Sequence, residues 1–211
     1  MNRAEPASGT IDVSKIRHIM ILGTEGGELL LYVPYRGSEP VNPDMHAALL
    51  RAVLHLSKDE LRTIRWKNSI YIFEAASHAI ALIGMTSVDD EALYRGKLMK
   101  ILQQFEINYD DVIRSGVGDV RQFKDFALNI IEEFPLANIS LDTIAQSIET
   151  GSVIPWRTAE VDFKLEIIQQ SANGKRTLND IAQLVGISER EVIALASILQ
   201  YYGWIELIED S

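Results

Sequence analysis

The stretch Thr177–Val192, TLNDIAQLVGISEREV, decides the fold of the C-terminal part of the chain. Its apolar residues recur at helical spacing on both sides of Gly186, which predicts two helices joined by a glycine turn. Thr177 and Ser188 are residue types that cap helix N-termini, so each is expected to start one helix. Gly186 is expected at the tight turn, where an ordinary side chain would clash. The stretch therefore predicts a helix-turn-helix.

The flanking segments extend this motif. Phe163–Gln170 has a helical period and is expected as the leading helix, and the chain is expected to return as a short strand after Gly203. With these additions, the segment from Glu160 to Glu209 resembles the winged-helix family. The resemblance implies a winged helix-turn-helix domain over residues 157–211, and a fold of this kind does not by itself imply DNA binding.

The charge balance argues against DNA reading by this motif. The whole chain has a formal net charge of −10, divided as −1 over residues 1–107, −5 over residues 108–156 and −4 over residues 157–211. An acidic segment repels the phosphate backbone, which supplies most non-specific DNA affinity. The second helix offers one basic residue, Arg190, between two glutamates. DNA is therefore not the expected partner, although a DNA-binding regulator stays open as the alternative.

The front half alternates strand and helix patterns. Five short apolar runs predict strands, and the last of them is apolar on both faces, which is typical of a central strand covered on both sides. Asp89 and Asp90 are suited to start a second helix. In chain order the expected elements are two strands in Ile16–Arg36 around Gly26-Gly27, a helix in Asn42–Ser57, strands in Arg62–Lys67, Ser69–Ala75 and Ala79–Met85, and a final helix.

This order of elements resembles the longin and profilin-like domains, and the roadblock group more distantly. The resemblance implies an α/β (α+β) domain over residues 15–109, with a five-stranded antiparallel sheet flanked by helices, after a flexible N-terminus at residues 1–14. It also implies a non-enzymatic docking or dimerisation module, often one that serves small GTPases or trafficking machinery. Residues 110–156 are then expected to form a helical connector.

The connector contains a similarity to the C-terminal domain at an offset of 37 residues. FALNIIEEF from Phe126 aligns with FKLEIIQQS from Phe163, and SLDTIAQS from Ser140 aligns with TLNDIAQL from Thr177. A duplication and two unrelated helix pairs with the same apolar spacing both explain the match. Either interpretation predicts a degenerate helix-turn-helix whose second helix starts at Ser140. The helix in Phe126–Phe134 fits the front domain equally well.

No catalytic constellation is found in the sequence. The four histidines are scattered without the i, i+4 spacing of a helical metal site, and GTEGGE lacks the Lys-Ser/Thr ending of a phosphate loop. We therefore expect no catalytic residue, no cofactor and no metal. The chain has no cysteine, no signal-peptide pattern, and no apolar run of the ~18 residues that a membrane helix needs. A cytoplasmic protein without a membrane span is expected.

Five residues are candidates for binding a partner. Tyr201 and Tyr202 are adjacent on a helix, so both cannot face one core, and aromatic side chains are enriched at binding hot spots. Arg190 lies on the second helix of the motif, and Arg65 and Lys67 lie on the polar face of a front strand. The sequence therefore predicts a protein-interaction adaptor that docks a small GTPase or forms a homodimer. The alternative is a winged-helix transcriptional regulator with an N-terminal dimerisation or sensor domain.

Overall fold

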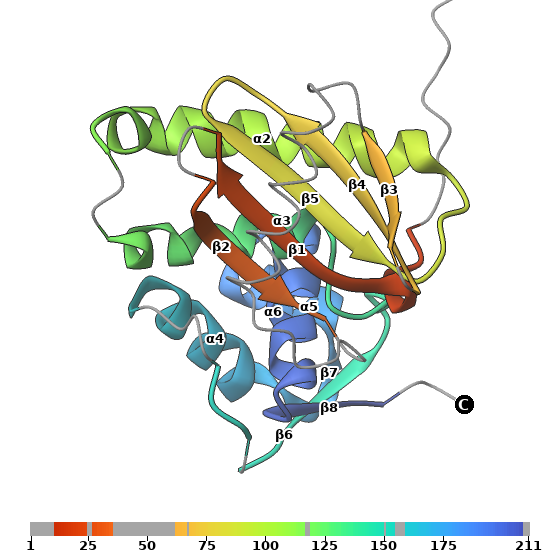
Figure 1. Ribbon diagram of the computed structural model, residues 1–211. Helices are drawn as coiled ribbons and strands as arrows, with labels where there is room; N and C mark the ends of the chain where they lie inside the picture. Colours follow the sequence, from red (N-terminus) through yellow and green to blue (C-terminus); the bar gives the residue numbers. More distant parts are fainter. Residues whose placement is uncertain are drawn as a thin grey trace, which may run out of the picture. The chain divides into compact units, whose positions relative to one another are not determined.

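The chain divides into two compact units, Met1–Gly118 and Asp119–Ser211, in a computed structural model (Figure 1). The structure describes residues 11–24, 27–35, 62–66, 68–116, 119–149, 151–154 and 159–208. The helix expected in Asn42–Ser57 and the candidate residue Lys67 lie outside the described residues.

The first unit is built on a five-stranded antiparallel sheet with the strand order β2-β1-β5-β4-β3. This confirms the mixed α/β class and the five-stranded antiparallel sheet. β5 is the central strand and is almost entirely buried, as its apolar sequence predicted. The strands are β1 (Ile16–Gly23), β2 (Leu29–Pro34), β3 (Thr63–Trp66), β4 (Ser69–Ala75) and β5 (Ala79–Met85), after the short 3₁₀ helix η1 (Val13–Lys15).

Helix α2 (Glu91–Arg114) packs on one face of this sheet, against β4 and β5 (Figure 1). The helix begins where the sequence predicted, because the Asp90 carboxylate accepts a hydrogen bond from the Leu93 N–H at 3.2 Å. Its sheet-facing stripe is the expected one: Tyr94, Leu98, Ile101, Leu102 and Phe105 are all buried. The helix continues past Tyr109, where the front domain was expected to end.

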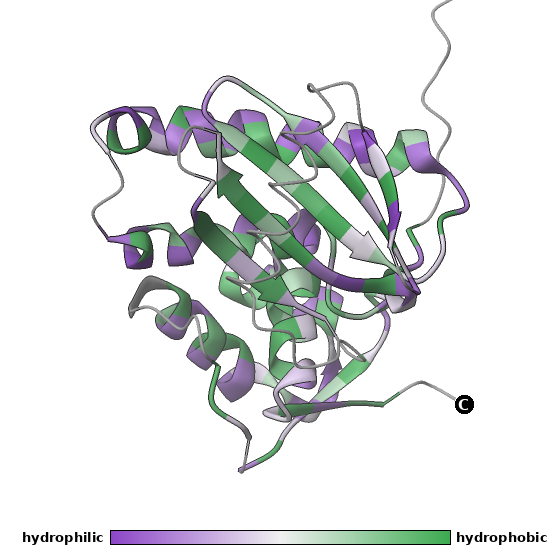
Figure 2. Ribbon diagram, viewed as in Figure 1, coloured by the Kyte–Doolittle hydropathy of each residue, from purple (hydrophilic) through white to green (hydrophobic). Residues whose placement is uncertain are grey.

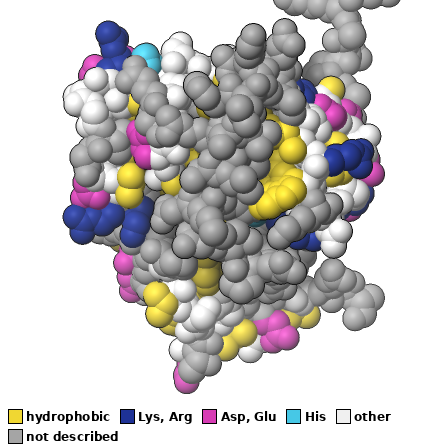
Figure 3. Space-filling model, in the orientation of Figure 1, with side chains coloured by type: hydrophobic (Ala, Val, Ile, Leu, Met, Phe, Trp, Pro, Cys, Tyr) yellow, Lys and Arg dark blue, Asp and Glu magenta, His cyan; other side chains and the backbone are white. Residues whose placement is uncertain are grey.

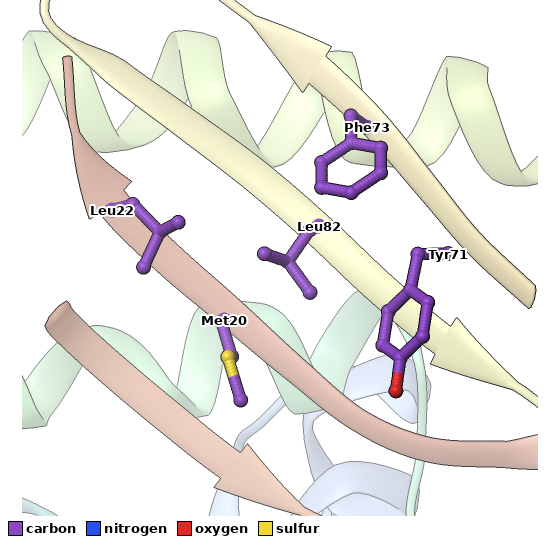
Figure 4. Close-up of a cluster of buried hydrophobic side chains, with 5 residues drawn as sticks. All are labelled: Met20, Leu22, Tyr71, Phe73 and Leu82. Carbon is purple, nitrogen blue, oxygen red and sulfur yellow. The ribbon is translucent and has the colours of Figure 1, made fainter. Parts of the chain in front are cut away.

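The opposite face of the sheet carries a second apolar cluster. Strand register places its members on one side of β1, β4 and β5, and Figure 4 shows them projecting away from α2. The apolar colouring of β1 and β5 in Figure 2 fits a sheet that is covered on both faces. The cluster comprises Met20, Leu22, Tyr71, Phe73 and Leu82.

His18 extends this cluster at one end of the sheet. Its ring is buried and lies between the rings of Tyr32 and Tyr71, with centroids 5.8 Å and 5.9 Å away. A Cβ atom at Gly84, opposite on β5, would stand 2.6 Å from His18 Nε2. Glycine at position 84 therefore leaves room for the imidazole against the central strand.

The second unit packs helices on a small antiparallel sheet with the strand order β7-β6-β8. Helix α6 contacts α3, α4, α5 and β8 and forms the centre of the unit. The elements are η2 (Val120–Phe126), α3 (Ala127–Glu133), β6 (Ile144–Ser147), α4 (Ala159–Ser171), β7 (Asn173–Thr177), α5 (Leu178–Val185), α6 (Glu189–Tyr201) and β8 (Ile205–Ile208). The helix in Phe126–Phe134, whose membership the sequence left open, belongs to this unit.

The helix predicted to start at Ser140 is wrong. The chain makes a turn there, with the Thr143 N–H donating to the Ser140 carbonyl at 3.2 Å, and then forms strand β6. Thr177 caps α5 reciprocally with Asp180 three residues later, whereas the third residue after Ser140 is Thr143, which has no carboxylate for that return bond. Two flanking strands then pair with β6 and favour the extended chain.

Strand β8 forms after Gly203, as predicted, but its partner is unexpected. Gly203 has φ of 76° and ends the turn after α6. β8 then pairs with β6, which precedes α4 in the chain, and β6 occupies the centre of the sheet. The small sheet thus takes its central strand, β6, from a segment that precedes α4 and the helix-turn-helix. The assignment of a winged helix to residues 157–211 therefore stays a prediction.

Candidate protein-interaction site

The helix-turn-helix of the second unit is formed by α5, Gly186 and α6. The Thr177 hydroxyl accepts from the Asp180 N–H at 3.1 Å, and the Asp180 carboxylate accepts from the Thr177 N–H at 3.0 Å. Gly186 adopts φ of 75°, in the left-handed region that favours glycine. The Ser188 hydroxyl accepts from the Glu191 N–H at 3.1 Å and caps α6. Each of the three fold-defining residues therefore has the local role expected of it.

The N-terminus of α5 is occupied by a loop of the same unit. The Leu178 N–H donates to the Thr143 carbonyl and the Asn179 N–H to the Leu141 carbonyl, both at 3.0 Å. The next N–H, of Asp180, is used by the Thr177 cap. Free N–H groups at a helix N-terminus are what binds a phosphate, and here the first turn of α5 donates them to the protein itself.

Helix α6 is buried from Ala194 to Leu199, whereas Glu189 and Arg190 at its N-terminus are exposed. A recognition helix in the DNA major groove must present side chains of its N-terminal part to base edges. Every residue from Ala194 to Leu199 is buried, and α3, α4 and α5 all pack on the helix. The Ser197 hydroxyl is buried as well and accepts a hydrogen bond from the Leu136 N–H at 3.1 Å.

Arg190 is held by the end of α3. Its Nε donates to the Glu132 carbonyl at 3.0 Å, and its guanidinium forms an ion pair with the Glu133 carboxylate. The Glu133 side chain is only 4% exposed, so it relies on this cation for its charge balance. Burial raises the pKa of the neighbouring Glu132 carboxyl. The basic residue expected to face a partner therefore holds its own unit together.

The C-terminal aromatic residues have different environments. Tyr202 is 8% exposed and packs edge-on against Tyr201, with centroids 4.9 Å apart, so Tyr202 is not available as a contact residue. Tyr201 is half-buried and keeps an accessible edge. The Trp204 indole N–H donates to the Ser152 carbonyl at 3.0 Å, and its ring lies so close to Gly151 that a Cβ there would be 2.4 Å away.

A groove of about 270 Å³ lies beside Trp204, and the sequence did not predict it. It forms because the Trp204 indole holds the segment before α4 against the unit, through the bond to Ser152. The groove is lined by Ile154, Leu165, Glu166, Gln169, Leu199 and Trp204. The apolar pair Val153-Ile154 was a signal for it, because that pair stands outside both predicted helices of this region.

Phe163 lies on α4, the helix that supplies Leu165, Glu166 and Gln169 to the groove, and it distinguishes the two halves of the 37-residue similarity. Phe126 is buried, whereas Phe163, its counterpart in the alignment, is 66% exposed. One position therefore belongs to the core and the other to the surface. This is a second structural difference between the two similar segments, after the strand β6 that follows Ser140 in place of a helix.

In the first unit, Arg65 is exposed on the edge strand β3, as its alternation with Ile64 and Trp66 predicted. The neighbouring cation Arg95 is engaged by Glu74 and Glu91, so it does not extend a free basic surface. Hydrophobic side chains reach the surface on the face of the molecule seen in Figure 3. Ile64 and Trp66, which are half-buried, pack at the margin of the apolar cluster.

Within the described ranges, no group of three or more His, Cys, Asp or Glu side chains is placed to hold a metal ion. No helix in the same part of the chain is both long and apolar enough to cross a membrane. No protein-family model matches this chain, and no curated protein matches it significantly.

Proposed function

We propose that this chain is a cytoplasmic, non-enzymatic adaptor that binds proteins through both of its units. The observation that carries the proposal is the internal use of the DNA-reading parts of the helix-turn-helix. The N-terminus of α5 is bound by the loop carbonyls of Leu141 and Thr143, α6 is buried from Ala194 to Leu199, and Arg190 in its first turn is paired with Glu133. A motif used in this way supplies a rigid scaffold for a protein surface.

The resemblance of the first unit to longin-like domains suggests two kinds of partner, a small GTPase and a second copy of this chain. The five-stranded sheet with α2 on one face supports the resemblance, and its edge strands offer backbone groups for pairing.

A DNA titration separates the adaptor from the transcriptional regulator. We expect no binding of a mixed-sequence duplex at micromolar protein and moderate salt, measured by fluorescence anisotropy. The exposed cation Lys175 and its neighbour Arg176 lie just before α5 and are the residues that could contact a backbone. Salt-sensitive binding that is lost in the double variant Lys175→Ala/Arg176→Ala would favour the regulator instead.

A further inference from the structure

We propose that the groove beside Trp204 binds a basic amphipathic segment of a protein partner, with an apolar side chain in the groove and a Lys or Arg against Glu166. This proposal rests on the adaptor function and names the chemistry of one partner. All residues that carry it belong to the second unit.

The floor of the groove is apolar and small. Ile154, Leu165 and Leu199 are buried beneath it, and Trp204 forms one wall with its half-buried ring. The volume of about 270 Å³ is below the roughly 300–1,000 Å³ of pockets that enclose drug-sized ligands. One or two side chains of a docked peptide therefore suit the groove better than a cofactor does.

The margins of the groove expose apolar surface. Val153, next to Ile154 in the lining, is 85% exposed, and Phe163 is 66% exposed. Phe163 lies three residues before Glu166 on α4, so the two side chains are neighbours on the helix surface. The exposed Phe163 ring next to Glu166 therefore offers apolar contact area to a partner that docks on α4.

The charge of the groove selects a basic partner. Glu166 is exposed at the rim, and its carboxylate accepts a hydrogen bond from the Gln170 amide at 3.0 Å. Lys164, on the same helix, is bound to Glu191 at 2.8 Å and does not neutralise Glu166. A second copy docked symmetrically here would bring the same patch, with the same Glu166 and without an added cation. A cationic segment of another protein complements this surface.

The test is a titration of the full-length protein followed by ¹⁵N–¹H spectra. The probe is an amphipathic helical peptide of Leu and Arg, and the matched peptide replaces every Arg by Glu. The Trp204 indole N–H, assigned by elimination with Trp66→Phe and Trp156→Phe, reports on the groove directly. We expect saturable shifts of this signal and of α4 amides with the Leu/Arg peptide, and no shifts with the Leu/Glu peptide.

Three variants make the test specific. Glu166→Lys is expected to weaken the Leu/Arg peptide by about tenfold or more, and Phe163→Ser to weaken it several-fold. Asp111→Lys makes the same charge change at an exposed position on α2 and should leave affinity unchanged. Both altered α4 side chains are exposed, so the dispersion of the spectra should show a retained fold.

Several results would overturn the groove proposal. If Glu166→Lys and Asp111→Lys weaken binding of the Leu/Arg peptide equally, the peptide responds only to the net charge of the protein. If the Leu/Glu peptide binds as tightly as the Leu/Arg peptide, the groove does not select a basic partner. Binding that occurs only in Trp156→Ala would show that the chain's own segment fills the groove. None of these results bears on the DNA titration, so failure of the groove and failure of the adaptor function are distinguishable.

Discussion

Arg95 joins three elements of the first unit through one guanidinium group. Its NH1 donates to the Phe73 carbonyl at 3.0 Å and to the Glu74 carboxylate at 2.6 Å, and its NH2 donates to the Thr63 hydroxyl at 2.8 Å. Its Nε donates to the Glu91 carboxylate at 2.9 Å. Helix α2 is thereby bound to β3 and β4 by a planar group whose donors diverge in fixed directions.

Removing this guanidinium should destabilise the first unit strongly. The Glu74 side chain is 8% exposed, so Arg95→Ala leaves a buried carboxylate without its cation. We expect a loss of about 3 kcal/mol or more in the free energy of unfolding, measured by urea denaturation. Arg95→Lys keeps the charge but not the forked geometry, so its free energy of unfolding should lie between those of the wild type and Arg95→Ala. A loss below about 0.5 kcal/mol in Arg95→Ala would contradict this account.

Glu132 makes the stability of the second unit depend on pH. Burial raises the pKa of its carboxyl above the ordinary 4.5, so the folded state binds this proton more tightly than the unfolded state. The resulting stabilisation is fully present below pH 4.5 and is lost as the pH rises through the folded-state pKa.

Glu132→Gln should therefore raise the urea midpoint at pH 7.5, because the amide carries no charge to bury. At pH 4, where the carboxyl is protonated, variant and wild type should have the same midpoint. The hydrogen bond from Arg190 Nε should persist in Glu132→Gln, because its acceptor is the main-chain carbonyl of residue 132. Loss of that bond should therefore not affect the comparison. A lower midpoint for the variant at pH 7.5 would show that the ionised carboxylate is favourable in the folded state.

At the scale of elements, the turn between α5 and α6 depends on backbone conformation alone. Gly186 has φ of 75°, and a Cβ placed there would meet nothing within 4 Å. Gly186→Ala should therefore cost about 1–2 kcal/mol from left-handed strain without any clash. Gly186→Asn should cost less, because asparagine tolerates this conformation. Thermal unfolding of the three proteins checks the order, and a larger loss for Asn than for Ala would contradict it.

The sequence predicted most elements of the first unit because their signals are local. A cap at Asp90, an apolar stripe on α2 and alternation in β3 each depend on neighbours in the chain. The strand β6 could not be predicted in the same way. Its segment is similar in sequence to the start of helix α5. Pairing with β7 and β8, which follow it in the sequence, decides its conformation.

At the scale of the whole molecule, the two edges of the first sheet differ in their capacity to pair. The Tyr35 N–H donates to the Arg17 carbonyl at 2.8 Å, so alternation directs Pro34, which has no N–H, to the open side of β2. The Phe73 N–H donates to the Arg62 carbonyl at 2.9 Å, and alternation then directs the backbone groups of Arg65 to the open side of β3. Of these two edges, β3 is the better template for a second strand.

We therefore expect a homodimer that pairs through β3. Arg65→Pro removes an outward N–H without breaking the ladder to β4, and should convert the dimer to a monomer. Arg65→Ala removes only the side chain and should remain dimeric. Light scattering of the full-length chain at tens of micromolar measures both. A wild-type monomer, or a dimer that survives Arg65→Pro, would remove the edge-pairing mechanism.

The candidate site shows the limit of sequence reasoning most clearly. Glycine at 186 and the caps at Thr177 and Ser188 were readable, because a turn and a helix start are set by the residues that form them. The burial of Tyr202 and the pairing of Arg190 were not readable. The Tyr202 carbonyl accepts a hydrogen bond from Ser152, and Arg190 is held by the end of α3, so segments more than 45 residues away shape both environments.

The sequence by itself determined the class of the fold, the five antiparallel strands, the long helix and the helix-turn-helix, since periodicity and capping are properties of short stretches. Only the tertiary structure decided that β6 is a strand, that α6 is buried from Ala194 to Leu199, and that Trp204 and Ile154 border a groove. The physical reason is that burial and strand pairing are contacts between distant segments. Such contacts select one of several local conformations that the same residues allow.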